Sequence, residues 1–136
     1  MAIYLWIAIG SALGGMGRFA LNNFVSERLG AAFPLGNIIG TLLINVIGSL
    51  AIGFFYTLTS AGSRWVVAEE GRIFFMVGIC GGFTTFSAFS LQTLNLFRSG
   101  DWLRGGGYVV ASVVLCLLAV WLGHVAAALM NSTRAS

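Results

Sequence analysis

Long uncharged apolar stretches dominate the chain and are separated by short charged segments. Uncharged runs cover residues 2–17, 29–63, 73–97 and, one histidine apart, 105–133. A helix needs about 20 apolar residues to cross a hydrocarbon core about 30 Å thick. The pattern therefore predicts an all-α membrane protein, a single transmembrane domain over residues 1–136. We expect four helices, at about residues 3–21, 35–58, 73–97 and 103–129, the first borrowing a few residues beyond Arg18.

The third run contains a cluster of residues that disfavour a continuous helix. Gly78, Gly81 and Gly82 weaken a helix through their backbone freedom, and β-branched Thr84 and Thr85 have low helix propensity. We expect about one turn to unwind here. Carbonyls freed at mid-membrane depth are tolerated only inside protein or beside a polar cavity, so a break predicts an ion site or pathway. The alternative is a glycine face for helix packing, which the glycines alone would favour.

A face of mixed aromatic and hydroxyl side chains follows the break. Phe86, Phe89, Ser90 and Thr93 stand at i, i+3, i+4 and i+7, and Ser87 lies on the neighbouring strip. Hydroxyls turned toward lipid would lack hydrogen-bond partners. The pattern therefore favours a pore wall.

Two polar residues in the first and second spans have a structural and a functional interpretation. Arg18 either extends to the headgroups near a helix end or attracts an anion into an aqueous vestibule. Asn45, with Thr41 four residues earlier on the same side, either bonds another helix or offers its two amide donors to an anion. Both alternatives stay open at this point.

The fourth span carries Tyr108 and Ser112 on one face, where a hydrogen bond inside a helix pair is the structural interpretation. His124 is interpreted as a packed or interfacial histidine, since no second candidate ligand accompanies it. Cys80 and Cys116 lie inside predicted spans and lack the spacing of a disulfide scaffold or a metal site.

Composition narrows the function classes. Hydrophobic residues make up 58% of the chain and charged residues 8%, which is typical of an integral membrane protein. The net charge of +3 is too small and dispersed for nucleic acid. The sequence has no nucleophile and base pair, no metal cluster and no phosphate loop, so we expect no enzyme. No acidic residue falls within a predicted span, and Glu69 and Glu70 belong to a connecting loop with Arg64 and Arg72.

The arginines are divided almost equally between the two ends of the predicted bundle. One side would hold three arginines and the amino terminus, and the other side would hold four arginines. The positive-inside rule therefore gives almost no preferred orientation. Insertion in both orientations, as an antiparallel homodimer, would accommodate this balance. The two sets are Arg64, Arg72 and Arg134 against Arg18, Arg28, Arg98 and Arg104.

Three motifs together resemble the Fluc (CrcB) family of fluoride channels. They are Gly-Gly-Met-Gly-Arg-Phe at 14–19, Gly-Thr-Leu-Leu-Ile-Asn at 40–45 and Gly-Gly-Phe-Thr-Thr-Phe-Ser-Ala-Phe-Ser at 81–90. They occur in the family's order and the similarity spans nearly the whole chain. Two positions depart from the family pattern: Ala88 replaces a threonine of some members, and Gln92 a glutamate of many. We expect these departures to alter the rate while leaving Asn45, Phe86 and Phe89 in place.

The resemblance implies a passive fluoride channel of the bacterial inner membrane that exports cytoplasmic fluoride and lowers its toxicity. It implies an antiparallel, dual-topology homodimer with two pores and a broken third helix. A structural sodium ion would sit on the dimer axis, bound by the backbone carbonyls of Gly81 and Thr84. The fluoride pathway would comprise Asn45, Phe86, Phe89, Ser87, Ser90, Thr41, Tyr108, Ser112 and Arg18.

Fluoride is small and strongly hydrated, so a pore must replace its water with fixed donors. Amide and hydroxyl groups supply such donors, and the positive edges of phenylalanine rings add weak contacts that let an ion leave. Two other classes stay open: a four-helix, dual-topology, proton-coupled exporter, which would need an intramembrane carboxylate, and a non-transporting membrane assembly subunit, whose glycine strips would serve packing alone.

Overall fold

A computed structural model describes residues 2–29, 36–60, 63 and 65–132. Its described elements are all helical. Four segments are long and apolar enough to cross a membrane: α1, α2, the run from Glu69 to Arg98, and α6. The prediction of a multi-pass, all-helical membrane protein is confirmed. The elements are α1 (Ala2–Leu29), α2 (Gly36–Leu58), α3 (Glu69–Ile73), η1 (Phe74–Cys80), α4 (Gly81–Phe83), α5 (Phe86–Arg98) and α6 (Trp102–Ser132).

Helix α1 is longer than the sequence pattern predicted. We expected a polar connector over residues 22–34, but the helix continues to Leu29. Its polar residues are satisfied by α2, because the Asn22 amide and the Ser26 hydroxyl both donate to Asn37 Oδ1, at 3.3 and 2.9 Å. Arg18 therefore lies about 16 Å from the carboxyl end of the helix rather than close to it.

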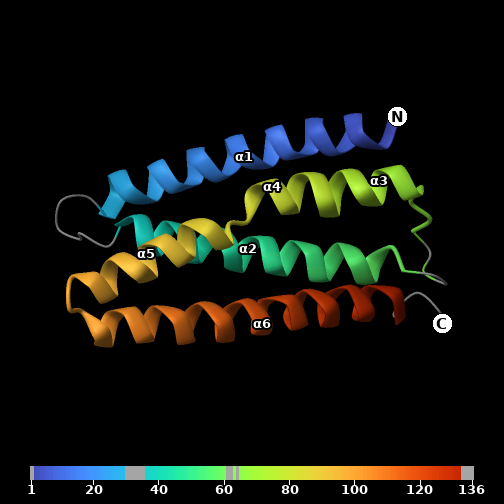
Figure 1. The fold of residues 1–136 in the computed structure, drawn as a ribbon. Helices are drawn as coiled ribbons and strands as arrows, with labels where there is room; N and C mark the ends of the chain where they lie inside the picture. The colour runs from blue at the N-terminus through green and yellow to red at the C-terminus, as the bar shows by residue number, and fades with distance from the viewer. Residues whose placement is uncertain (1, 30–35, 61–62, 64, 133–136) are drawn as a thin grey trace.

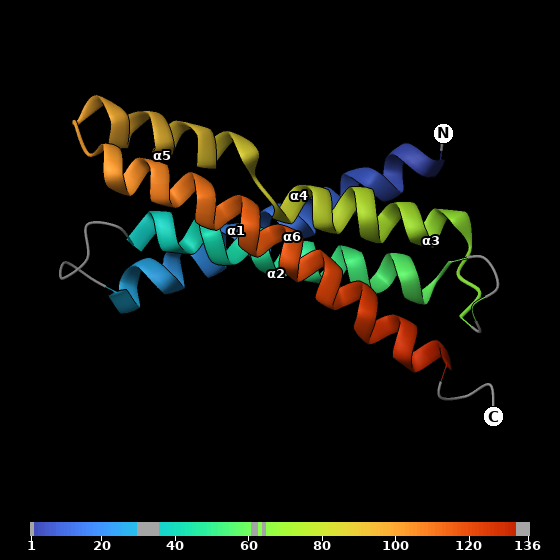
Figure 2. The same cartoon turned by 90° about the horizontal axis from the view of Figure 1, so that it is seen from below.

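The third span divides into two parts with different neighbours (Figures 1 and 2). Elements α3, η1 and α4 follow α1, whereas α5 lies along α6. Helix α2 runs through the middle and packs extensively against α6. The chain thus changes partner between α4 and α5, and this change opens space between α2, α4 and α6.

The glycines of the third span pack against α1 and do not unwind. A Cβ atom built on Gly10 would approach the Gly78 Cα to 2.8 Å, and one built on Gly82 would approach the Ser11 Cα to 2.8 Å. Gly78 and Gly82 are helical, in the π-helical η1 and in α4. The expected unwinding of the glycines is therefore wrong, because close packing on α1 keeps them helical, and the packing interpretation of the glycines is confirmed.

The break itself is real and lies at the two threonines. Thr84 has φ −77° and ψ 156°, and Thr85 has φ −149° and ψ 109°, so both are extended. The helix resumes at Phe86. The third span is broken as predicted, a few residues later than its glycines suggested.

Apart from Arg18, the described arginines lie at opposite ends of the bundle. Arg72, in α3, lies at the same end as the amino terminus of α1 and the carboxyl end of α6 (Figure 1). Arg28, Arg98 and Arg104 lie at the other end, where α1 and α5 finish and α6 begins. Arg64 and Arg134, which completed the predicted charge balance, lie outside the described residues.

Candidate functional site

Two adjacent threonines end one helix and begin the next. The Thr84 backbone N–H and its hydroxyl both donate to the Cys80 carbonyl, each at 2.9 Å, which closes α4. The Thr85 hydroxyl oxygen accepts from the Ala88 N–H at 3.2 Å and caps the amino terminus of α5. Threonine is a favoured N-cap because its oxygen satisfies an otherwise unpaired N–H. Local sequence chemistry therefore fixes the break between these residues.

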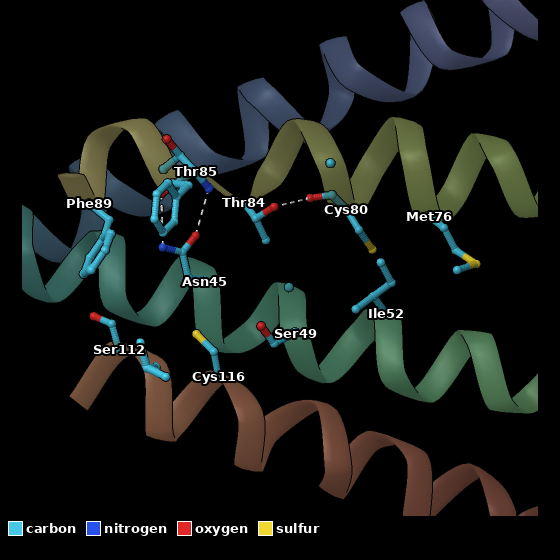
Figure 3. Close-up of a pocket in the computed structure, with 14 residues that line it drawn as sticks. Asn45, Ser49, Ile52, Met76, Cys80, Thr84, Thr85, Phe89, Ser112 and Cys116 are labelled. Atoms are coloured by element: carbon cyan, nitrogen blue, oxygen red, sulfur yellow. Dashed lines mark hydrogen bonds between the residues drawn. The ribbon is translucent and has the colours of Figure 1, made fainter. Parts of the chain in front are cut away.

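Asn45 of α2 binds the extended backbone through two hydrogen bonds (Figure 3). The Thr85 N–H donates to Asn45 Oδ1 at 2.8 Å, and Asn45 Nδ2 donates to the Thr85 carbonyl at 3.2 Å. Of the two roles that the sequence left open, the structure shows the bond between helices. The amide nitrogen carries two hydrogens and this bond uses one, so a second N–H donor remains.

The same hydrogen bonds release two backbone carbonyls. In a continuous α-helix the N–H groups of Thr85 and Ala88 would donate to the carbonyls of Gly81 and Thr84, four residues earlier. Here they donate to the side chains of Asn45 and Thr85 instead. The Gly81 and Thr84 carbonyls are thereby left without their helical donors, at the depth where the third span breaks.

A cavity of about 370 Å³ lies beside the break, between α2, α4 and α6. The rings of Phe86 and Phe89 stand 5.3 Å apart at an angle of 47°. Phe89 is buried, whereas Phe86 is 77% exposed in the single chain. The Ser112 hydroxyl is buried and has no hydrogen-bond partner among the described residues. The lining, which contains no charged side chain, includes Asn45, Gly48, Ser49, Gly81, Thr84, Thr85, Phe86, Phe89, Ser112 and Cys116.

A second hollow of about 580 Å³ lies between α1, α2 and α5 and contains Arg18. Thr41, Asn22, Asn37 and Gln92 provide polar groups around it, and Thr85 lines this hollow as well as the central cavity. The Asn45 and Thr85 hydrogen bonds therefore stand where the two spaces approach each other. Arg18 thus lines a hollow from the interior of α1, and its attraction of an anion stays a prediction.

Several predicted hydroxyl donors are already occupied. The Ser90 hydroxyl donates to the Phe86 carbonyl at 2.9 Å, and the Thr93 hydroxyl donates to the Phe89 carbonyl at 2.8 Å. Ser87 lies 3.2 Å from the Thr85 hydroxyl, and neither it nor Ser90 lines the two spaces described. The hydroxyls of Ser90 and Thr93 are thus satisfied by their own helix, because helical hydroxyls can bond their own backbone. The place of Ser87 and Ser90 on a fluoride pathway stays a prediction.

Tyr108 does not bond Ser112, the pairing that the sequence suggested. Its hydroxyl donates to Gln92 Oε1 at 2.8 Å, and its ring lies 5.1 Å from that of Phe89. Sequence reasoning treated Gln92 as separate from the aromatic pair, whereas the structure connects them through Tyr108. The sequence placed Thr85 at the break but did not identify it as the cap of α5, although a threonine immediately before a helix is a recognisable cap signal.

His124 lies outside this site, whereas the two cysteines contribute to its lining. His124 Nδ1 lies 2.9 Å from the Thr57 hydroxyl, as the packed interpretation predicts. Cys80 and Cys116 are free thiols, and both line the central cavity. Within the part of the chain that the structure describes, no group of three or more histidine, cysteine or acidic side chains could hold a metal ion.

Comparisons with known proteins show which family the chain resembles over nearly its whole length. A family model described as CrcB-like protein, Camphor Resistance (CrcB), matches residues 5–124. A protein of Opitutus terrae called fluoride-specific ion channel FluC is 58% identical over the whole of both chains. Proteins of the same name from Methylocella silvestris and Paramagnetospirillum magneticum are 60% and 58% identical over 131 residues, which is 96% of this chain and at least 97% of each relative.

Proposed function

This chain belongs to the CrcB family, and we propose that it is a fluoride-specific ion channel of the inner membrane. The family is a channel family and not a family of enzymes. The observation that carries the proposal is the buried, unpartnered hydroxyl of Ser112, facing Phe89 in a cavity without charged side chains beside the helix break.

The cavity offers what a dehydrated fluoride ion needs. Ser112 supplies a hydroxyl donor, Asn45 a second amide N–H, and the amino terminus of α5 a partial positive charge. Phenylalanine rings presented edge-on add weak favourable contacts. Arg18 raises the local anion concentration in the adjoining hollow. Weak, fixed, uncharged contacts suit conduction because the ion must leave as readily as it enters.

Proton-coupled export is the less favoured mechanism. It requires a carboxylate that exchanges protons inside the membrane. The acidic residues of the described helices lie in the terminal turns or at the helix ends, at Glu27, Glu69, Glu70 and Asp101. A channel needs no such group. Passive flow then lets cytoplasmic fluoride leave down its gradient, and HF that crosses the lipid and ionises inside the cell supplies that fluoride.

Purified protein in liposomes is expected to release loaded potassium fluoride passively and to retain chloride. The physical reason is that uncharged donors and ring edges in a small cavity suit a small, strongly hydrated anion. A fluoride electrode measures the efflux, and protein-free liposomes give the background. Fluoride movement that occurs only with an imposed proton gradient would favour the exporter instead.

An antiparallel homodimer would complete the pathway. Phe86 is 77% exposed in one chain and Gly81 is exposed beside it, so a pore-lining ring and the freed carbonyls open onto an uncovered surface. A second copy packed there would shelter both from lipid. The near tie of arginines between the two ends permits the opposite insertion of that copy.

Tags on the carboxyl terminus are expected on both faces of the membrane, because neither end of the helical bundle holds a decisive excess of arginine. A membrane-impermeant label applied to intact spheroplasts, and then to opened ones, measures the two populations. A single-orientation membrane protein expressed in parallel calibrates the labelling. Tags found on one face only would contradict dual topology.

A structural sodium ion fits the residues at the break. The carbonyls of Gly81 and Thr84 lack their helical donors, and oxygen ligands suit a hard cation. A Cβ built on Gly81 would meet the Met76 carbonyl oxygen at an ordinary 3.9 Å, and Gly81 is exposed, so its backbone is accessible to a ligand. Two carbonyls from each of two copies would together bind the ion, which would stabilise the broken segments without being transported.

A further inference from the structure

The amide of Gln92 in α5 joins three helices. Its Nε2 atom donates to the Thr41 hydroxyl at 2.9 Å and to the Asn37 carbonyl at 3.2 Å, both in α2. Its Oε1 atom accepts from the Tyr108 hydroxyl of α6 at 2.8 Å. Thr41 and Tyr108 are both buried. One side chain thereby connects the wall of the Arg18 hollow with the helix that faces the central cavity.

The partners determine which end of the amide faces which helix. A backbone carbonyl can only accept a hydrogen bond, so the atom that faces Asn37 must be the nitrogen. The oxygen must then accept from Tyr108, whose single hydroxyl proton is used in that bond. An ionised carboxylate could not reproduce this arrangement, because it has no donor for the Asn37 carbonyl. The site is built for a neutral group that both donates and accepts.

Tyr108 transmits this arrangement to the aromatic pair. Its ring lies 5.1 Å from the Phe89 ring at an angle of 55°. Both rings are buried, at 6% and 8% exposure. Since the hydroxyl of Tyr108 is held by Gln92, the ring cannot tilt away from Phe89 without breaking a buried hydrogen bond.

We propose that Gln92 is a positioning residue for the fluoride pathway, which holds Phe89 in place through Tyr108 by hydrogen bonds that require an amide. The inference rests on the proposed function and adds to it that conduction in this chain depends on the neutral donor and acceptor at position 92. It predicts that a carboxyl group at this position works only when it is protonated. A neutral carboxyl has an O–H donor for the Asn37 carbonyl and a C=O acceptor for Tyr108, and the Thr41 hydroxyl can reverse its role and donate to it.

The test compares fluoride currents of full-length variants in planar bilayers at two pH values. We expect Gln92→Glu to lower the current at least about tenfold near pH 7.5, through the loss of the amide donor bonds. The current should recover several-fold near pH 5.5. Burial raises a carboxyl pKa above its ordinary value of about 4.3, and we expect this effect to outweigh that of the charged side chains lining the same hollows, Arg18 of α1 and the paired Arg104 and Asp101 at the start of α6. The unmodified protein should give the same current at both pH values.

Asn95→Asp is the matched control. Asn95 stands three residues further along α5, is exposed, and has no side-chain hydrogen bond among those described. This variant adds the same charge on the same helix without touching the Gln92 contacts. Its current should stay within about twofold of the unmodified protein at both pH values, as for a solvent-screened charge.

Other results would overturn either the role of Gln92 or the proposed function. Unchanged current in Gln92→Glu near pH 7.5 would overturn the proposal, and so would an equal loss at both pH values. If that variant does not fold, Gln92→Met replaces it: we expect a tenfold loss at both pH values, and an unchanged current would overturn the proposal. Absence of fluoride current in the unmodified protein would instead count against the proposed function.

Discussion

Phe89→Ile is expected to lower fluoride flux on the order of a hundredfold, which corresponds to about 2.7 kcal/mol of lost stabilisation at the narrow part of the pathway. Phe89 is buried against Tyr108 and faces the cavity that also contains Ser112. Isoleucine fills a similar volume but presents no positive ring edge to an anion. The ion would then shed water there without a replacement contact. Phe86→Ile should have a comparable effect if the exposed ring meets a second copy.

A second aromatic pair provides the control. Phe55 and Phe75 are stacked with centroids 4.2 Å apart, and neither lines the central cavity. Phe75→Ile should lower the melting temperature and leave the flux per folded protein near that of the unmodified chain. Efflux from liposomes, normalised to correctly folded protein by gel filtration, measures both variants. Unchanged flux in Phe89→Ile would remove this ring from the pathway.

Asn45→Leu is expected to destabilise the fold by about 1–3 kcal/mol, because it leaves the Thr85 N–H without a partner inside the membrane. The Thr85 N–H donates to Asn45 Oδ1, and the Thr85 carbonyl, at the N-cap of α5, also accepts from Asn45 Nδ2. Leucine has nearly the same shape, so the loss reflects hydrogen bonding rather than packing. Fluoride flux should fall together with the stability of the fold, since the Asn45 amide also supplies a donor to the cavity.

The same variant tests the sodium proposal. In the unmodified protein, prepared without sodium, the melting temperature should rise when sodium chloride replaces potassium chloride, since a bound ligand stabilises the folded state. In Asn45→Leu the extended backbone at Thr85 loses the amide that holds it, so the Gly81 and Thr84 carbonyls lose their fixed positions and the sodium effect should disappear. The control is Asn95→Leu, on the exposed face of α5. This variant should keep the rise in melting temperature with sodium. An unchanged melting temperature and sodium response in Asn45→Leu would contradict both roles of this residue.

The hydrophobic pattern was sufficient to predict the membrane class and the number of spans. Charged residues cannot be hidden in lipid, so their spacing alone delimits four apolar helices. It predicted less about helix ends, because polar residues such as Asn22 and Ser26 continue α1 when another helix supplies their partners. The glycines show the same limit: their backbone freedom disfavours a helix in isolation, but close contact with Gly10 and Ser11 keeps them helical.

Sequence by itself determined the chemical character of the site: aromatic rings, hydroxyls and one asparagine beside a helix break, with no acidic residue within a predicted span. Tertiary structure alone decided which of these groups are free. Ser90 bonds its own helix, Ser112 stays unpaired, Asn45 holds Thr85, and Gln92 holds Tyr108. The reason is physical: a residue's type fixes what it can donate or accept, whereas its partner depends on the rotation and separation of neighbouring helices, which periodicity leaves undetermined.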